Sequence, residues 1–98
     1  MPIQVHSDEI NATGNVQRDS VDLKSGILTG VHVSAVTNVG TVTLKSGGAG
    51  GKNILPQIHV GIAASVHITG LAVKYVAPLH ATIDDTNTTM VVHVDEGA

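Results

Sequence analysis

From Val21 onward the chain alternates apolar and polar residues in short runs, which glycine, proline and asparagine interrupt. Residues 40–45 (GTVTLK) show the pattern most clearly, because Val42 and Leu44 alternate with threonine and lysine. A period of two residues is typical of a β-strand with one buried face, and no segment keeps helical spacing over three turns. The pattern predicts strands at residues 27–36, 40–45, 53–60, 64–69, 71–76, 79–83 and 89–94.

The side chains available for a core are small. Among 98 residues there is no Phe or Trp and one Tyr, Tyr75, so packing must rest on Val, Ile, Leu and Ala. Such side chains fill a thin layer between two sheets, but they bury less area per residue than aromatic side chains do. Short strands separated by regular turns therefore predict a single all-β domain, an antiparallel β-sandwich of jelly-roll type. The modest core also favours additional burial between subunits.

The first 19 residues lack the strand pattern. They are mostly polar and have no clear period, apart from one short strand expected at residues 3–6. We therefore expect an extended N-terminal arm at residues 1–19 and the β-sandwich domain at residues 20–98. Termini are often loose unless they dock. A sharper alternative is that this arm docks on a neighbouring subunit.

Charge and composition disfavour two classes of partner. The formal net charge is −3 with only five Lys and Arg residues, whereas affinity for nucleic acid scales with the number of basic contacts to phosphate. We expect no nucleic-acid partner. We also expect no membrane partner, because no apolar run reaches the roughly 18 residues that a spanning helix needs. The chain contains no cysteine, so disulfides and thiolate metal sites are excluded.

The glycine-rich run at residues 44–55 (LKSGGAGGKNIL) is similar to a phosphate-binding loop only at first sight. That motif requires a glycine five residues before Gly51 and a hydroxyl residue after Lys52. Ser46 and Asn53 occupy those positions. The following residues contain Pro56 and do not favour the helix that would hold a phosphate. The interpretation that remains is a connection between two antiparallel strands, and no nucleotide cofactor is expected.

Five of the six histidines stand between apolar residues, as in Val31-His32-Val33 and Val92-His93-Val94. Adjacent side chains of a strand point to opposite faces, so histidines flanked by core aliphatics should face outward. Their simplest role is to line an outer surface or a subunit contact. The five are His32, His59, His67, His80 and His93.

A shared metal ion or a pH-sensitive patch is the functional alternative. If Ile83 pairs with Met90, then His80 and His93 become direct cross-strand neighbours and candidate metal ligands. A zinc site needs three or four ligands in a tetrahedral array, and a rotation axis of an oligomer could supply copies of one histidine. Protonation near about pH 6 would then add like charges and loosen the oligomer. The sequence itself identifies no cofactor.

Catalysis is not expected. No Gly-x-Ser-x-Gly nucleophile motif occurs, and Asp84 and Asp85 lie in a turn, where Asp normally makes turn hydrogen bonds. Asp8-Glu9 and Asp95-Glu96 lie near the ends of the chain, where we expect them to be solvated. An enzyme also needs a concave site with convergent polar groups, which short connections between strands do not favour.

Four segments carry a resemblance to a known class of proteins. They are residues 30–35 (GVHVSA), 40–47 (GTVTLKSG), 79–83 (LHATI) and 89–94 (TMVVHV). An apolar strand with a small-residue turn, a Thr/Val/Leu strand before a glycine-rich loop, and a closing Val strand resemble short virion proteins of tailed bacteriophages. The resemblance covers about two thirds of the chain. This chain departs from the class in its few aromatic residues, many histidines and longer N-terminal segment.

The resemblance implies a structural protein, and first a capsid decoration or cement protein. Such a protein would be made in the host cytoplasm and would bind the major capsid protein on the surface of the virion as a homo-oligomer, which we expect to be a homotrimer. A tail, neck or fibre component of the virion is the second reading. A non-enzymatic ligand- or metal-binding β-sandwich module is the third, although carbohydrate binding normally uses exposed aromatic residues and only Tyr75 could serve.

Overall fold

The computed structural model describes residues 3–84 and 87–97. The described residues form β-strands joined by turns, and the all-β class predicted from the sequence is confirmed. The strands are β1 (Ile3–His6), β2 (Gly14–Asn15), β3 (Gln17–Arg18), β4 (Val21–Asp22), β5 (Gly26–Ser34), β6 (Gly40–Ser46), β7 (Lys52–Asn53), β8 (Ile58–Val60), β9 (Ser65–Ile68), β10 (Val73–Tyr75), β11 (Leu79–Ile83) and β12 (Thr89–Glu96).

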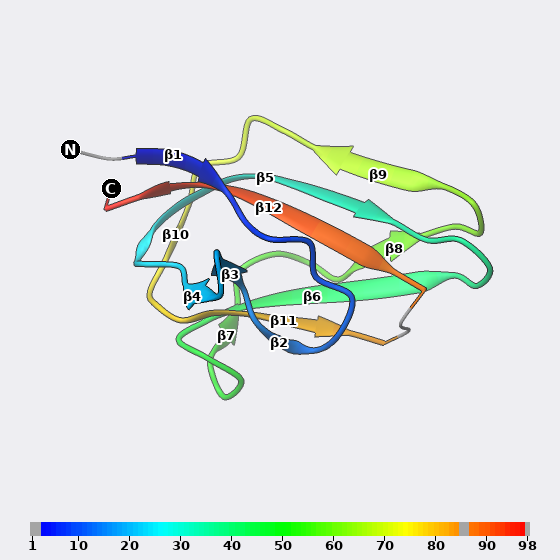
Figure 1. Ribbon diagram of the computed structural model, residues 1–98, viewed down its shortest axis with the longest axis horizontal. Coiled ribbons are helices and arrows are strands. Elements are labelled where there is room, and N and C mark those ends of the chain that lie inside the picture. The colour runs from blue at the N-terminus through cyan, green and yellow to red at the C-terminus, as the bar shows by residue number, and fades with distance from the viewer. Residues whose placement is uncertain (1–2, 85–86, 98) are drawn as a thin grey trace.

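Two antiparallel sheets form the two layers of the molecule (Figure 1). Sheet A has the order β1-β12-β5-β10, with β9 also paired to β5, and sheet B has the order β2-β11-β6-β7, with β8 also paired to β6. The small hairpin β3-β4 stands apart from both sheets. The pairing is nested, because β1 pairs with the last strand, β12, and β2 pairs with the one before it, β11. Further inside, β5 pairs with β9 and β10, and β6 pairs with β7 and β8.

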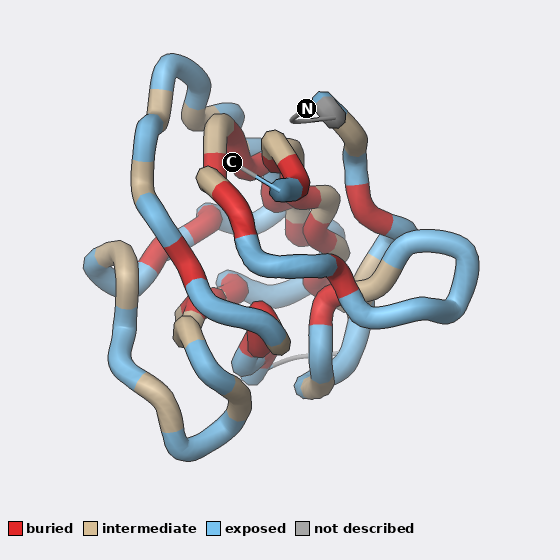
Figure 2. Tube along the Cα trace, turned by 90° about the vertical axis from the view of Figure 1, so that its left-hand side faces the viewer, coloured by how far each residue is buried: buried red, intermediate tan, exposed pale blue. Residues whose placement is uncertain are grey.

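The core lies between the two sheets and is aliphatic, as the composition requires. Buried residues gather toward the middle of the molecule, whereas the loops that project from it are mostly exposed (Figure 2). Burial of these side chains is the main favourable term in folding. The fully buried members with the largest side chains include Leu23, Leu28, Leu44, Leu79 and Met90.

A β-bulge in β5 explains why this long strand departs from simple alternation. Its register with β12 shifts so that Gly30 pairs with His93 while Leu28 pairs with Val94, which leaves Thr29 without a partner of its own. The Thr29 hydroxyl donates a hydrogen bond to the His93 carbonyl oxygen (3.1 Å). Because a bulge adds one residue to one strand, Leu28 and Val31 both reach the core although they are three residues apart.

The described part of the N-terminal segment packs on the β-sandwich of the same chain. The strand expected at residues 3–6 forms, and it pairs with β12, while β2 pairs with β11. Ser7 is buried; its backbone N–H donates to the Val92 carbonyl oxygen (2.7 Å), and its hydroxyl oxygen accepts from the Val92 N–H (2.9 Å). Val16 is completely buried in the core. The described residues of the expected arm thus extend both sheets, because backbone pairing and the aliphatic side chains of Val5, Ile10 and Val16 hold a segment that has no apolar period.

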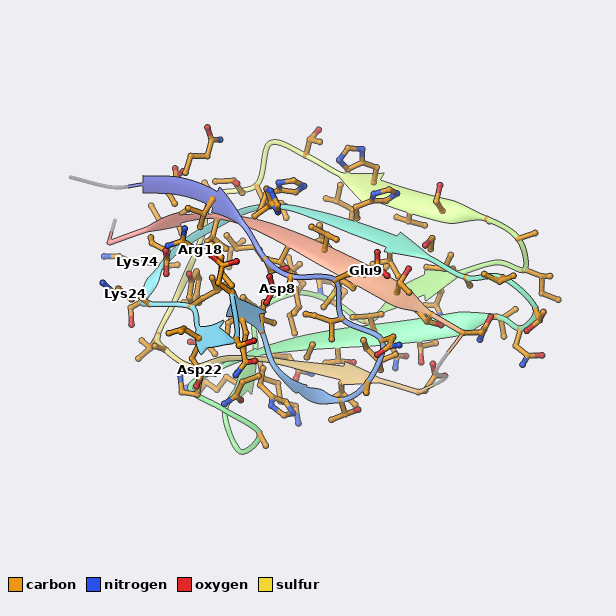
Figure 3. All side chains as sticks on the ribbon, viewed as in Figure 1. Asp8, Glu9, Arg18, Asp22, Lys24 and Lys74 are labelled. Carbon is orange, nitrogen blue, oxygen red and sulfur yellow. The ribbon has the colours of Figure 1, made fainter. Side chains whose placement is uncertain are left out.

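Asp8 organises the hairpin formed by β3 and β4. The two turn residues, Asp19 and Ser20, have φ of 53° and 65°, the left-handed values that two-residue hairpin turns need. Their backbone N–H groups both donate to the Asp8 carboxylate, each at 3.1 Å. Figure 3 shows Asp8 beside this hairpin, near Arg18. The two backbone hydrogen bonds lower the pKa of Asp8 below its ordinary value of 3.8, with smaller contributions from His6 and Arg18.

We expect Asp8→Asn to reduce the acid sensitivity of the fold. Because the folded-state pKa of Asp8 is depressed, its stabilising contribution is complete above about pH 4 and is lost as the pH falls through the folded-state pKa. Urea unfolding midpoints at pH 5 and pH 3 should therefore differ less in Asp8→Asn than in the wild type. Glu9→Gln, at the exposed neighbouring position, is the control. Equal acid sensitivity of Asp8→Asn and the wild type would contradict this role.

The glycine-rich run turns the chain between two antiparallel strands, as predicted. β6 pairs with β7 through Ser46 and Lys52. Gly47 and Gly48 have φ of 87° and 95°, a backbone region that glycine adopts without steric cost. A β-carbon at Gly51 would collide with the Ser46 carbonyl oxygen, so glycine is required at this position.

The connection between β11 and β12 is fixed by side chains that bind backbone. The Asn87 side-chain oxygen accepts hydrogen bonds from the N–H groups of Val36 (2.9 Å), Thr37 (2.9 Å) and Asn38 (3.1 Å). Asp84 accepts one from the Thr41 N–H (2.8 Å), which links the end of β11 to the neighbouring strand β6. Asp85 lies outside the described residues.

Replacement of the buried Thr88 by valine is expected to increase the stability of the fold. Its side chain is completely buried, and within the described part of the chain its hydroxyl has no hydrogen-bond partner. A buried hydroxyl without a partner costs about 1–3 kcal/mol, and valine has nearly the same shape. Thr88→Val should raise the free energy of unfolding by about 1 kcal/mol, measured by urea denaturation.

The control for this prediction is the same substitution at the next position. The Thr89 hydroxyl lies 2.8 Å from the Ser34 hydroxyl, within hydrogen-bond distance. Thr89→Val should therefore lower the free energy of unfolding. A Thr88→Val variant that is less stable than the wild type would show that the hydroxyl is satisfied in solution.

Tyr75 and Glu96 are both buried. Tyr75 is 2% exposed and donates a hydrogen bond to the Lys24 carbonyl oxygen (2.6 Å); burial and then the nearby Glu96 raise its pKa to about 12. Glu96, expected to be solvated, is 8% exposed. Its carboxylate accepts hydrogen bonds from the Lys24 N–H (2.8 Å) and from Arg18 (3.3 Å). These partners compensate for the burial of its charge.

Candidate functional site

Four strands of sheet A place one histidine each on the outer face of the sandwich. His6 lies on β1, His93 on β12, His32 on β5 and His67 on β9. The chain neighbours of each ring point inward and are buried or half-buried, so strand alternation turns the four rings outward. We call these four residues the histidine row.

The pairing of the strands makes the row continuous. His6 and His93 are direct cross-strand partners, and so are His32 and His67. The ring centres of His6 and His93 are 6.2 Å apart, those of His93 and His67 are 6.4 Å apart, and those of His67 and His32 are 5.0 Å apart. The row therefore crosses four strands from one side of the sheet to the other.

Gly30 lines the space between His67 and His93 in the middle of the row. It pairs with His93 at the bulge of β5, and a β-carbon there would lie 3.0 Å from the Ile68 carbonyl oxygen and 3.7 Å from the His93 β-carbon. Without a side chain at this position, an open hollow of about 450 Å³ separates His67 from His93. Its lining is Gln4, Thr29, Gly30, His67, Thr69, Gly70, Leu71 and His93.

The chemistry of the row follows from imidazole. Histidine is the side chain whose ordinary titration falls between pH 5 and 8, and its neutral form is a common metal ligand. The formal net charge is −3 with neutral histidines, so full protonation of all six would make it +3, with four of the added charges on this face. The row therefore places four imidazole side chains, each a potential metal ligand, on one face of the sandwich.

The structure does not bring together the pair predicted from the sequence. His80 lies on β11 in sheet B, whereas His93 lies on β12 in sheet A. The expected register was wrong, because Ile83 pairs with Val42 and Met90 pairs with Val33. The connection between β11 and β12 passes from one sheet to the other instead of making a hairpin.

The outward orientation predicted for the five histidines agrees with the exposure of four of them. His32, His59 and His67 are exposed and His93 is half-buried. His80 differs, because it is only 8% exposed and its Nδ1 lies 3.2 Å from the Asn15 side-chain oxygen. This contact comes from β2, whose pairing with β11 the sequence pattern did not reveal.

His6 was missed in the sequence analysis as a member of the site. Its neighbour on one side is Val5, but on the other side it is Ser7, so it lacks the apolar pair that marks the other five. Ser7 nevertheless is buried. The usable signal was the short strand expected at residues 3–6, because alternation within it turns His6 away from Val5.

The other clusters of polar side chains are weaker candidates for a binding site than the histidine row. A second open hollow, of about 330 Å³, lies beside the β3-β4 hairpin and is lined by Gln4, Val5, His6, Asp8, Arg18 and Asp19. Arg18 is engaged with Glu96 at 3.3 Å and Asp8 with the turn. Within residues 3–84 and 87–97, no three histidine, aspartate or glutamate side chains are grouped so that they could hold a metal ion.

Comparison with known proteins adds no relative: no family model, no curated protein and no solved structure matches the chain. Among the described residues, no helix is long and apolar enough to cross a membrane.

Proposed function

We propose that this protein is a structural component of a tailed-bacteriophage virion, and specifically a capsid decoration protein. The observation that carries the proposal is the nested pairing of the strands. If the separate β3-β4 hairpin is left out, and β7 and β8 count as one strand and β9 and β10 as another, eight strands remain. Their partners are first with eighth, second with seventh, third with sixth and fourth with fifth. We propose on this ground that the sandwich is a jelly roll, an architecture that viral capsid domains use.

Lectins and cupins use the same architecture, so the interior and the surface must support the choice. The space between the sheets is filled by aliphatic side chains, which favours binding on the outside of the sandwich. Tyr75, the one aromatic residue of the chain, is buried and gives no stacking platform for a sugar. The histidines of sheet A lie on an open face, which suits a non-enzymatic contact with another protein surface better than it suits catalysis.

One end of the sandwich offers an apolar contact surface. Val36 and Val39 in the loop between β5 and β6, and Ile62 in the loop between β8 and β9, are exposed aliphatic residues. The two loops are joined by backbone hydrogen bonds from Ala63 to Val36 and from Ala35 to Ala64, each 3.0 Å long. We propose that this apolar loop end contacts the major capsid protein, since exposed apolar patches mark protein interaction sites.

A decoration protein is present in many copies, so a modest contact per copy gains strength when subunits associate. We propose a homotrimer on the surface of the shell, with synthesis in the host cytoplasm. Solution mass from size-exclusion chromatography with light scattering tests the trimer. A monomer in solution and on the shell would reject it.

The assignment to the shell is tested by copy number. Quantitative mass spectrometry of purified virions should find this protein at a level similar to that of the major capsid protein. A tail, neck or fibre component would be present in far fewer copies, and absence from the particles would reject a virion role altogether.

The apolar loop end is tested by cosedimentation of the purified protein with assembled shells of the same phage. Val36→Ser and Ile62→Ser should weaken binding. Val76→Ser is the matched control, because Val76 is as exposed as Val36, at 64%, but lies in the loop between β10 and β11. Equal binding by the Val36→Ser and Val76→Ser variants would exclude this end as the contact.

A further inference from the structure

We propose that His32 and His67 form a binding site for a divalent metal ion of the zinc class. The two residues are direct cross-strand partners on β5 and β9, and both side chains are exposed on the outer face of sheet A. This inference concerns only the histidine row and stands independently of the virion proposal. It also places the site away from His80.

The separation of the two rings fits shared coordination. Zinc binds histidine nitrogen at about 2.0–2.1 Å in tetrahedral geometry, which puts the centres of two coordinating rings about 5 Å apart. The ring centres of His32 and His67 are 5.0 Å apart and their planes are inclined by 30°. The other two neighbouring pairs of the row are more widely separated, at 6.2 Å for His6 and His93 and 6.4 Å for His67 and His93.

The donor set defines the class of ion. Imidazole suits zinc, copper and nickel, whereas magnesium and calcium prefer oxygen ligands. Two protein ligands leave the other coordination positions to water, in agreement with the absence of a three-residue metal group among the described side chains. Because the ligands must be neutral, affinity falls as the solution becomes acidic.

A bound ion would connect β9 to the rest of sheet A. β9 pairs with β5 along residues 65–68 and has no second partner strand among the described residues. Edge strands are held by one ladder of hydrogen bonds only. A metal ion that binds His67 and His32 adds a link across this ladder and should slow local opening of β9.

Isothermal titration of the tag-free protein at pH 7.5 with zinc chloride tests the site. We expect saturable binding of one ion, and His32→Gln and His67→Gln should each weaken it about tenfold or more. His59→Gln, at an exposed histidine on β8 in sheet B, should bind like the wild type. Magnesium chloride should give no saturable signal.

Unchanged zinc affinity in His67→Gln, or an equal loss in His59→Gln, would overturn the proposal. Circular dichroism melts of each variant without metal show that the fold is retained, which is expected because both positions are exposed. Hydrogen exchange followed by NMR provides a second readout. Zinc should slow hydrogen exchange of the β9 amides in the wild type but not in His32→Gln. If zinc left the exchange rates unchanged in both proteins, the site would also be rejected.

Discussion

Replacement of Gly26 by alanine is expected to lower the free energy of unfolding by about 3 kcal/mol. Gly26 begins β5 and is paired on both sides, with Glu96 of β12 and with Tyr75 of β10. A β-carbon at this position would collide with the backbone carbonyl of Asp95. Backbone cannot rotate away as a side-chain end does, so two strands must separate locally, next to the buried carboxylate of Glu96.

The control for Gly26→Ala is Gly14→Ala. Gly14 also lies in a strand, β2, but a β-carbon there meets no atom within 4 Å. Alanine should be neutral or slightly stabilising at Gly14, because it reduces the freedom of the unfolded chain. Urea denaturation of both variants measures the difference. If the two substitutions had equal effects, the close approach of β12 to β5 at Gly26 would be wrong.

Local pattern was sufficient where a strand is long and has one buried face. The run at residues 40–45 corresponds to β6, where buried and half-buried positions alternate. The run at residues 79–83 corresponds to β11, although β2 covers its outer face at His80. The run at residues 53–60 was predicted as one strand and forms two, β7 and β8, on either side of Pro56. Proline lacks the N–H that a ladder needs, so it interrupts pairing.

Pairing between distant strands could not be predicted from the sequence. β11 and β12 are neighbours in the chain, with a turn-forming segment between them, and these features favoured a hairpin. In the structure the Asn87 side chain binds the loop at residues 36–38, and the chain changes sheets. Such a contact joins residues about fifty positions apart, and no local period records it.

The candidate site, too, could be predicted only in part, because local alternation is visible in the sequence and long-range pairing is not. Alternation correctly placed His32, His59, His67 and His93 away from the core. Which of them meet depends on strand order and register, including the register shift of β5 against β12 next to His93. The sequence could therefore indicate outward histidines but could not identify the histidine row.

The N-terminal segment, expected to be an extended arm, pairs with both sheets. Val16→Ala measures how much this segment contributes to the stability of the fold. Val16 has no exposed surface, and its backbone donates a hydrogen bond to the Leu79 carbonyl oxygen (2.7 Å) and accepts one from the Leu23 N–H (3.2 Å). Removal of two buried methyl groups and the resulting cavity should cost about 2 kcal/mol in the free energy of unfolding. Urea denaturation provides the measurement.

The control is Val21→Ala, the same substitution on β4, where the side chain is 66% exposed. We expect a change within about 0.5 kcal/mol there. A similarly small loss for Val16→Ala would mean that the segment is only loosely attached and can act as an arm. The large loss we expect would mean that deletion of residues 1–19 damages the core itself. Loss of shell binding after that deletion would then report unfolding, so contacts made by this segment must be tested with substitutions at its exposed positions.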